Sequence, residues 1–471
     1  MPGGMAAKSC TQHHGNWRGH ENFRTIGWVS VQPAPAGQRG NDRESSRIHR
    51  TVRAAMSARL SSAVWLTLYV VAVTAPLFVL LLGPVPPAGG FWWDFAMALG
   101  FAALAMMGVQ FVLTARFRRA TMPFGIDIVY YFHRYLAVFA LAIAGAHYLI
   151  LRVDSPVVLG TANPFDAPAH MTAGRAAITL FVLLAATAAF VLALWHVMGT
   201  GYYVDTPWKE ALWTGYGLFW IAIIGYVRIV KPWSLLRAPF RVAEVRRERG
   251  DASTLVLHPE RRNGMRFQPG QFAWLTLRAS PFALREHPFS IASSAARAGS
   301  IELTIKAVGD FTRAAVDALP GEKAFLDGPY GAFSIDRYPQ APGYAFMAGG
   351  VGIAPIMSML RTLADRGDRR PLTLLYGNRR WERVLFREEL VALAGRLDLR
   401  LVHVLKEPPE DWLGDRGQFT RELLEKRLPR EQSGLHYFIC GPTAMTQCIE
   451  RWLKSIDVAS TQVHSEIFEW V

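Results

Sequence analysis

The sequence is poor in cysteine and in charge. Its 471 residues include three cysteines, Cys10, Cys440 and Cys448. Three cysteines are too few for a disulfide scaffold, a four-cysteine zinc site or a cysteine-ligated iron–sulfur cluster. Charged residues make up 19% of the chain and apolar residues 51%, a balance that excludes disorder over most of the length. The length suits about three domains of ~150 residues each.

Charge is almost missing from long stretches of the N-terminal half. These runs are residues 61–83, 95–115, 128–151, 176–204 and 211–227, the third of which contains His133 and Arg134. Buried helices of a soluble protein would be shorter and would show a polar face. The first run alone is long enough to cross ~30 Å of hydrocarbon. The sequence therefore predicts five transmembrane helices in a lipid bilayer.

Positive charge is concentrated beside these runs. In a soluble protein the net charge of +14 would suggest nucleic-acid binding, but the sequence contains no nucleic-acid-binding motif. Arginines precede the first run and follow the second and the fifth, and such clusters lie on the cytoplasmic side of a membrane. Five crossings, however, would place the two ends of this region on opposite sides. One span is therefore missing, or one segment does not cross.

The C-terminal half changes to short strands and amphipathic helices. Strands expected over 253–257, 272–277 and 301–305 are separated by turn residues, as in an antiparallel barrel. Further on, expected strands alternate with expected helices, which is typical of a doubly wound α/β domain. These strands cover 344–348, 372–376, 399–404 and 436–439, and the helices cover 354–364, 382–394, 420–427 and 443–456.

Three loops of this half have the composition of nucleotide-binding loops. Gly349, Gly350 and Gly352 join a strand to a helix, where backbone can approach a pyrophosphate at the helix N-terminus. Arg379 and Arg380 follow the next strand, where arginine favours the 2′-phosphate of NADPH over NADH; the alternative is a solvated surface pair. Taken alone, Cys440 at the end of a later strand is typical of a buried structural cysteine.

The order of motifs resembles the ferredoxin–NADP reductase-like module. The motifs are PGQF (269–272), HPFSI (287–291), KAVGDFT (306–312), GPYG (328–331), GGVGIAP (349–355), YGNR (376–379), CGP (440–442) and HSEIF (464–468). The resemblance implies that Arg285, His287, Pro288, Phe289 and Ser290 hold the flavin ring of FAD, with Gly309, Phe311 and Thr312 near its pyrophosphate. It implies that Gly349, Gly350, Gly352, Ile353 and Pro355 cradle NADPH, with Arg379 at the 2′-phosphate. Cys440, Gly441 and Pro442 would flank the nicotinamide, and Cys440, Glu466 and Phe468 are the candidate catalytic residues.

The membrane half contains a pair of histidines at helical spacing. His133 and His147 are 14 residues apart, which places them on one helix face about 21 Å apart. Same-face imidazoles inside a membrane favour ligation of stacked haems over packing or pore-lining roles. The helix resembles the third helix of the ferric reductase-like transmembrane domain that NADPH oxidases and bacterial ferric reductases share. That resemblance makes His196 the outer haem ligand facing His147.

One departure from that family affects the inner haem. The family has a second histidine one haem-spacing upstream of His196, but Val182 and Leu183 occupy that place, and neither can ligate iron. Residues 176–198 resemble the N-terminal part of the family's fourth helix joined directly to the C-terminal part of its fifth helix. A deletion there would explain both the missing ligand and the conflict in the number of spans. His170, in a polar loop, is a poor replacement.

The sequence therefore predicts a ferric reductase-like membrane helical bundle, an antiparallel FAD barrel and a doubly wound NAD(P)-binding domain. The expected divisions are a disordered basic tail (1–59, with Met56 as an alternative start), a membrane domain (60–235), the FAD domain (238–338) and the NAD(P) domain (340–471). We expect a flavohaem oxidoreductase that passes electrons from NADPH or NADH through FAD and haem b to a ferric chelate, dioxygen or a quinone. The expected location is the bacterial inner membrane, with cytoplasmic soluble domains and unknown partner subunits. The alternatives are a haem-poor, membrane-tethered diaphorase and a non-catalytic scaffold.

Overall fold

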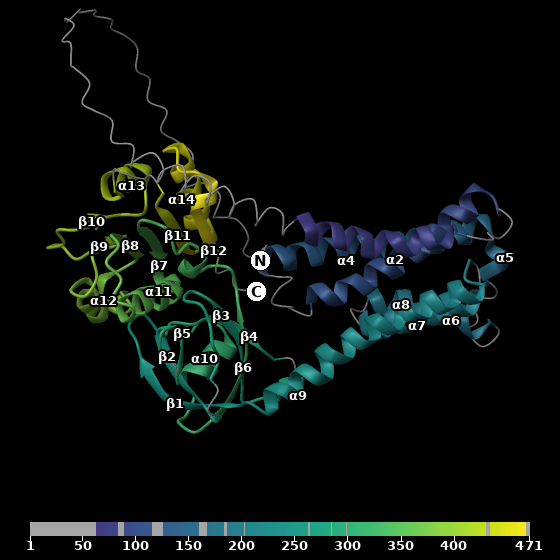
Figure 1. Ribbon diagram of the computed structural model, residues 1–471, viewed down its shortest axis with the longest axis horizontal. Helices are drawn as coiled ribbons and strands as arrows, with labels where there is room; N and C mark the ends of the chain where they lie inside the picture. Colours follow the sequence, from purple (N-terminus) through teal and green to yellow (C-terminus); the bar gives the residue numbers. More distant parts are fainter. Residues whose placement is uncertain are drawn as a thin grey trace, which may run out of the picture.

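The computed structural model describes residues 63–82, 89–114, 126–159, 167–182, 186–201, 203–261, 264–283, 285–297, 299–429 and 434–467. In chain order these residues form a helical bundle, an antiparallel β-sheet domain and an α/β domain (Figure 1). The predicted architecture of the two C-terminal domains is confirmed. The tail predicted over 1–59 lies outside the described residues.

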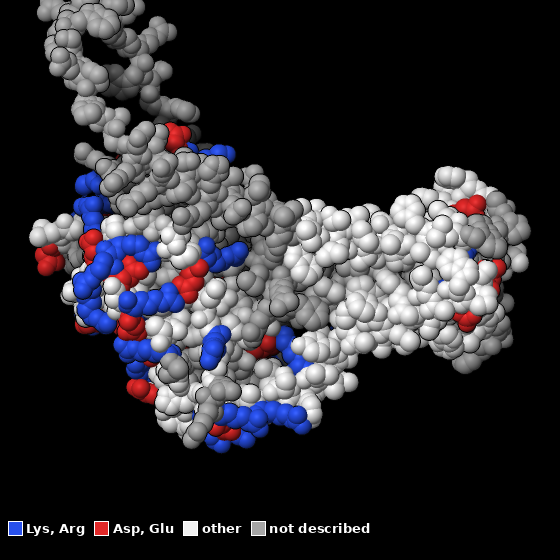
Figure 2. Space-filling model, in the orientation of Figure 1, with Lys and Arg blue, Asp and Glu red and all other residues white. Residues whose placement is uncertain are grey.

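Four described helices are long and apolar enough to cross a membrane. They are Ala63–Leu80, α2 (Phe91–Thr114), α4 (Ile126–Asp154) and the continuous helical segment Pro207–Leu236, which consists of α8 (Pro207–Gly225), a π-helical turn η1 (Tyr226–Val230) and α9 (Lys231–Leu236). Large apolar side chains such as Leu66 and Phe78 are exposed on them. Figure 2 shows a broad belt of this bundle without charged side chains, between the β domains and the far end. Such a surface suits contact with lipid.

The prediction of one helix over 176–204 is wrong. Two antiparallel helices occupy this part of the chain, α6 (Ala169–Val182) and α7 (Ala186–Thr200), and they pack against each other (Figure 1). Their 14 and 15 residues rise by only about 21 and 22 Å, less than the ~30 Å of a hydrocarbon core. The pair starts and ends at the end of the bundle far from the β domains, beside the short helix α5 (Pro156–Leu159).

This hairpin bears on the conflict in the number of spans. If the four long apolar segments cross a bilayer and the hairpin returns to the side it came from, the two ends of this region lie on the same side. Arg237 and Arg241 follow the last long apolar segment, and Arg228 and Lys231 lie near its end, so all four would be on the same side as the start of the first helix. Where five crossing helices were expected, the described residues contain four that are long and apolar enough to cross.

The first C-terminal domain is a six-stranded antiparallel sheet in the order β4-β3-β6-β1-β2-β5. Its elements are β1 (Phe240–Arg247), β2 (Ala252–Pro259), β3 (Phe272–Leu277), β4 (His287–Ser290), β5 (Ile301–Lys306), α10 (Asp310–Val316) and β6 (Lys323–Tyr330). An isolated bridge between Ile291 and Leu303 brings the two edges together. The sheet thereby closes into a barrel around a core that includes Leu255, Leu275 and Leu303.

The second domain is a parallel six-stranded sheet in the order β10-β9-β8-β7-β11-β12. Its strands are β7 (Tyr344–Gly349), β8 (Leu372–Asn378), β9 (Leu399–Leu405), β10 (Asp415–Arg416), β11 (His436–Gly441) and β12 (Val463–Ile467). Its helices are α11 (Ile353–Asp365), α12 (Arg387–Ala394), α13 (Arg421–Arg427) and α14 (Thr443–Ser455). The strands that follow β7 in the chain are added on one side of it, and β11 and β12 are added on the other side. Open α/β sheets bind their ligands at the point where this order reverses, here between β7 and β11.

Candidate functional site

The residues expected to hold a flavin ring meet at one edge of the barrel. Ser290 on β4 lies opposite Phe272 on β3. Phe311 stacks on His287 with ring centroids 4.0 Å apart, and on Phe289 at 6.0 Å. The buried Ser290 hydroxyl has no hydrogen-bond partner among the described residues. Because buried polar groups are nearly always paired, this hydroxyl suits a polar atom of a bound ring. Arg285 and Pro288 are exposed at the same edge.

The residues expected near the FAD pyrophosphate shape a loop. The Thr312 hydroxyl accepts hydrogen bonds from the backbone N–H groups of Val308 at 2.9 Å and Gly309 at 2.8 Å. These bonds stabilise the first turn of α10. In this structure the hydroxyl of Thr312 is therefore committed to the helix start, and its contribution to a pyrophosphate site is to hold the loop.

Two loops touch at the point where the strand order reverses. A Cβ built on Gly352 would lie 2.3 Å from the carbonyl oxygen of Cys440, and one built on Gly441 would lie 2.4 Å from Cε of Met445. Gly350 has a φ of +55° and open space around it. The backbone contact therefore requires glycine at 352, the contact at 441 is with a flexible side chain that can move, and a left-handed backbone favours glycine at 350. The loop leads directly into α11, where Ile353 and Pro355 are buried.

The structure brings two of the candidate catalytic residues together. Cys440 and Glu466 are register partners on the parallel strands β11 and β12. Burial raises the pKa of the Cys440 thiol, and the Glu466 carboxyl raises it further. The thiol therefore stays protonated at neutral pH and contributes bulk rather than a nucleophile. Phe468 lies outside the described residues.

The arginines expected to meet a 2′-phosphate are already paired. Arg379 Nε lies 2.7 Å from Glu407 Oε1, and Arg380 Nε lies 2.9 Å from Glu407 Oε2. Glu407 follows β9, the strand next to β8, so the pair forms only in the folded sheet. The two arginines hold the pKa of the Glu407 carboxyl below its usual value. The carboxylate is therefore charged at neutral pH, and this corner of the sheet is less positive than the sequence suggests.

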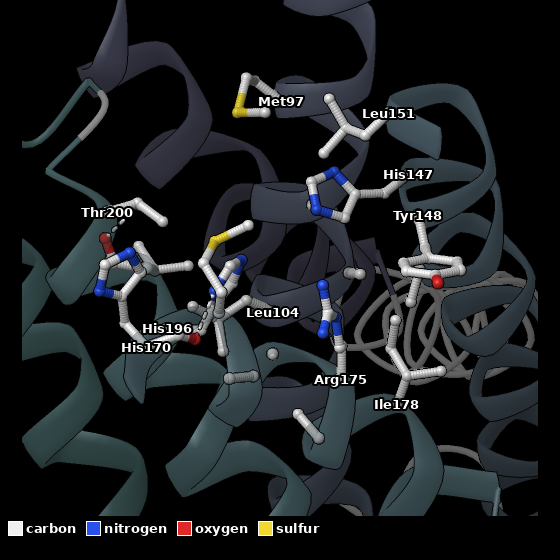
Figure 3. Close-up of a pocket in the computed structure, with 18 of the residues that line it drawn as sticks. Met97, Leu104, His147, Tyr148, Leu151, His170, Arg175, Ile178, His196 and Thr200 are labelled. Carbon is white, nitrogen blue, oxygen red and sulfur yellow. Dashed lines mark hydrogen bonds between the residues drawn. The ribbon is translucent and has the colours of Figure 1, made fainter. Parts of the chain in front are cut away.

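Two histidines face one pocket at the far end of the helical bundle. His147 comes from α4 and His196 from α7, and their ring centroids are 6.5 Å apart at 68° (Figure 3). The pocket is mostly apolar, and Arg175 is the residue with a formal charge in its described lining. Two metal–nitrogen bonds of about 2.0 Å plus two imidazole radii of about 1.1 Å give about 6.2 Å between centroids. The observed spacing therefore suits one metal ion between the rings.

Hydrogen bonds orient both imidazoles. Nδ1 of His147 lies 2.7 Å from the Ala96 carbonyl oxygen, and Nδ1 of His196 lies 2.8 Å from that of His170. A carbonyl only accepts, so each Nδ1 carries the proton and each Nε2 keeps its lone pair. Metal-ligating histidines are typically held in this way. The expectation that His147 and His196 come together is confirmed.

The inner position is built differently. His133 on α4 does not face another histidine; its Nδ1 is hydrogen-bonded to the amide oxygen of Gln110 on α2. The side chain of Val182 is exposed at the end of α6, and Leu183 lies outside the described residues. The described residues hold no second ligand opposite His133 and no group of three or more metal-ligating side chains. The structure therefore supports His133 as a hydrogen-bonded helix residue.

The placement of His170 in a polar loop is wrong, because it lies in the first turn of α6. It lines the pocket and offers its backbone carbonyl to His196. Two glycines of the pocket were not expected from the sequence. A Cβ on Gly100 would lie 3.0 Å from the His147 ring, and one on Gly174 would lie 2.8 Å from Nδ1 of His196. Glycines inside apolar helices were the available signal, because small residues allow close packing in membranes.

Comparison with known families agrees with the two C-terminal domains. Residues 238–334 match an FAD-binding domain, and residues 346–451 match the oxidoreductase NAD-binding domain. Together these domains form a ferredoxin–NADP reductase-like module. The C-terminal half of the chain therefore contains an FAD-binding domain and an oxidoreductase NAD-binding domain.

Curated relatives share this module. An NADH-cytochrome b5 reductase-like protein of Emericella nidulans is 40% identical over 134 residues, which are 28% of this chain and 28% of that protein. A glycine betaine monooxygenase reductase subunit of Chromohalobacter salexigens is 29% identical over 243 residues, 50% of this chain and 65% of that protein. The chain thus spans less than two thirds of the length of these relatives. A solved structure of the Amycolatopsis cytochrome P450 reductase GcoB has 23% identity and a TM-score of 0.44, covering 49% of this chain and 69% of that one.

Proposed function

We propose that the protein is a membrane-bound flavohaem oxidoreductase with one b-type haem between His147 and His196. Electrons from NAD(P)H would pass through FAD to this haem and on to a small acceptor at the far side, a ferric chelate, dioxygen or a quinone. FAD accepts a hydride and releases single electrons, and haem carries single electrons. The barrel edge around Ser290 would hold the flavin. The loops after β7 and β11 would hold the nucleotide.

The observation that carries this proposal is the orientation of the two imidazoles. Their Nε2 lone pairs are available, their spacing suits one metal ion, and the described residues offer no third protein ligand. A porphyrin supplies the remaining four nitrogen ligands. Arg175, in the same pocket, suits the negative propionates of a haem. The proposed location is a bacterial inner membrane, with the β domains cytoplasmic because basic residues flank that end of the bundle.

Haem content tests the proposal directly. The purified full-length protein is expected to contain about one haem per FAD, measured by pyridine haemochrome absorbance and by flavin absorbance after release. A ratio near two would require a second ligand set and would contradict the assignment of His133. A ratio near zero with intact FAD would support a second candidate, a membrane-tethered NAD(P)H diaphorase, which the short α6–α7 hairpin favours.

Glu407 is expected to determine the preference of the enzyme between NADH and NADPH, which carries the 2′-phosphate. The carboxylate occupies Arg379 and Arg380 and would repel the phosphate, so the wild-type protein should use NADH at least as well as NADPH. Glu407→Gln frees both guanidinium groups, and the ratio of kcat/KM for NADPH over NADH should rise about tenfold, equivalent to ~1.4 kcal/mol. The measurement is NAD(P)H oxidation with ferricyanide.

A matched surface pair provides the control for this variant. Arg421 and Glu425 lie 2.7 Å apart on α13, so Glu425→Gln removes the same charge from an arginine pair elsewhere. Its nucleotide preference should equal that of the wild type. An unchanged preference in Glu407→Gln would show that the two arginines do not meet the ribose.

A further inference from the structure

The last membrane helix runs without a break into the flavin barrel. α8, the π-helical turn and α9 form one continuous helical segment from Pro207 to Leu236. α9 then packs against β6 and against the short 3-10 turn Pro281–Ala283 (Figure 1). π-helical turns inside α-helices frequently mark functional positions. Here the turn immediately precedes Lys231, the residue that contacts the barrel.

Lys231 forms a closed polar contact with two residues of β6. Its Nζ lies 2.7 Å from Asp327 Oδ2 and 3.0 Å from the Tyr330 hydroxyl oxygen. The Tyr330 hydroxyl donates to Asp327 Oδ1 at 2.7 Å. The Lys231 side chain is 18% exposed and that of Asp327 is 9% exposed. We call these three residues the helix–barrel clasp.

A sequestered ion pair of this kind contributes little net stability. Its desolvation penalty offsets much of the Coulombic attraction, and its best-attested role is to specify one arrangement among several. A hydrophobic residue at position 231 would hold α9 against the barrel without fixing its angle. The clasp is therefore suited to defining orientation.

Residue pairing between neighbouring strands connects the helix–barrel clasp to the edge of the barrel that is expected to hold the flavin. Asp327 on β6 pairs with Trp274 on β3, and Trp274 pairs with Pro288 on β4. In the second row, Tyr330 pairs with Phe272, and Phe272 with Ser290. Pro288 and Ser290 are residues expected to hold the flavin ring. A shift of β6 relative to the helix would therefore carry the flavin edge with it.

We propose that Lys231 is a positioning residue that fixes the flavin site relative to the membrane helices. It would act through Asp327 and Tyr330 on the rate at which electrons leave the flavin for the haem, and not on hydride transfer from NAD(P)H. This inference rests on the proposed function. Each NAD(P)H oxidised to NAD(P)⁺ releases one proton and two electrons, which reduce two one-electron acceptors, either two ferricyanide ions directly or two acceptors reached through the haem.

Lys231→Met in the full-length protein tests the inference with two kinetic readouts. Turnover with ferricyanide added on the barrel side should remain within about twofold of wild type, because the flavin and nucleotide sites are untouched. Haem reduction by NAD(P)H in anaerobic stopped flow should slow about tenfold or more, since small misplacements have large kinetic costs. Lys231→Arg should restore much of the rate. The control is Arg237→Met, because Arg237 stacks on Trp233 of the same helix.

A structural readout independent of the cofactors completes the test. Spin labels at Thr214→Cys on α8 and Ser280→Cys on the barrel, with Cys10 and Cys448 replaced by serine, report the helix–barrel distance by pulsed EPR. The distribution should be narrow in wild type and Arg237→Met, and broad in Lys231→Met. An unchanged distribution and unchanged haem reduction would overturn the role of Lys231. Loss of ferricyanide turnover as well would show that Lys231 supports the barrel fold instead. A wild-type protein without haem would overturn the proposed function and this inference with it.

Discussion

Replacing His196 by alanine is expected to abolish haem binding while leaving FAD in place. His196 would provide one of the two Nε2 ligands, and its Nδ1 hydrogen bond to the His170 carbonyl holds Nε2 toward the pocket. Haem absorbance at the Soret band should fall about tenfold or more relative to FAD, because His147 alone would remain of the two histidines that would hold the haem. In proteoliposomes, reduction of an acceptor enclosed on the far side should fall in parallel.

Two histidine variants separate this assignment from its alternatives. His170→Ala removes a side chain from the same pocket but keeps the carbonyl that orients His196, so haem content should be retained. His133→Ala should also retain haem, because His133 is hydrogen-bonded to Gln110 and faces no second ligand. Equal reduction of an acceptor added on the barrel side by wild type and His196→Ala, with none of the enclosed acceptor reduced by either, would favour the diaphorase. Loss of half the haem in His133→Ala would restore a two-haem arrangement.

The second large effect is expected at Gly352. Its φ of −61° is accessible to any residue, so the constraint is steric. A Cβ would lie 2.3 Å from the Cys440 carbonyl oxygen and 3.0 Å from Gly441 Cα, and backbone atoms on both sides cannot yield cheaply. Gly352→Val should force the two nucleotide loops apart and lower NAD(P)H oxidation about 100-fold or more.

The measurements are steady-state ferricyanide turnover and FAD content. FAD should be retained in Gly352→Val, because the barrel is a separate sheet with its own core. Gly395→Ala is the matched control, since its nearest neighbour to a new Cβ is 3.5 Å away and its φ is −76°. If Gly352→Val oxidised NAD(P)H at the wild-type rate, the contact between the loops would not support nucleotide binding.

The soluble half was largely predictable because its signals are local. Buried strands read as short apolar runs, and the strands expected at 344–348 and 399–404 became β7 and β9 with one extra residue each. The glycine loop was predictable because its residues are adjacent in sequence and their backbone requirements are independent of distant contacts. Helix α12 begins at Arg387, after a 3-10 turn at Trp381–Arg383, rather than at residue 382 as expected.

The membrane half was predictable in composition but not in path. Hydropathy measures whether a segment can lie in lipid, and an apolar run of 29 residues satisfies it equally as one helix or as two. The three residues between α6 and α7 include no glycine, proline or charged residue, so no local signal predicted that the helix ends there. The contacts of α6 with α7 decided the path of this part of the chain.

The sequence by itself determined the class of protein, because flavin and nucleotide motifs keep their order and spacing along the chain. It also determined which residues could ligate a metal, since few side chains in the apolar runs have that chemistry. The family resemblance had already paired His147 with His196, and the structure supplied their spacing and the carbonyls that orient them. Only the tertiary structure showed that Glu407 pairs with two arginines 27 and 28 residues away and that Lys231 pairs with Asp327 on the barrel. These contacts join residues that are far apart in the chain. They form because the helices and sheets pack together, and a local sequence pattern does not predict that packing.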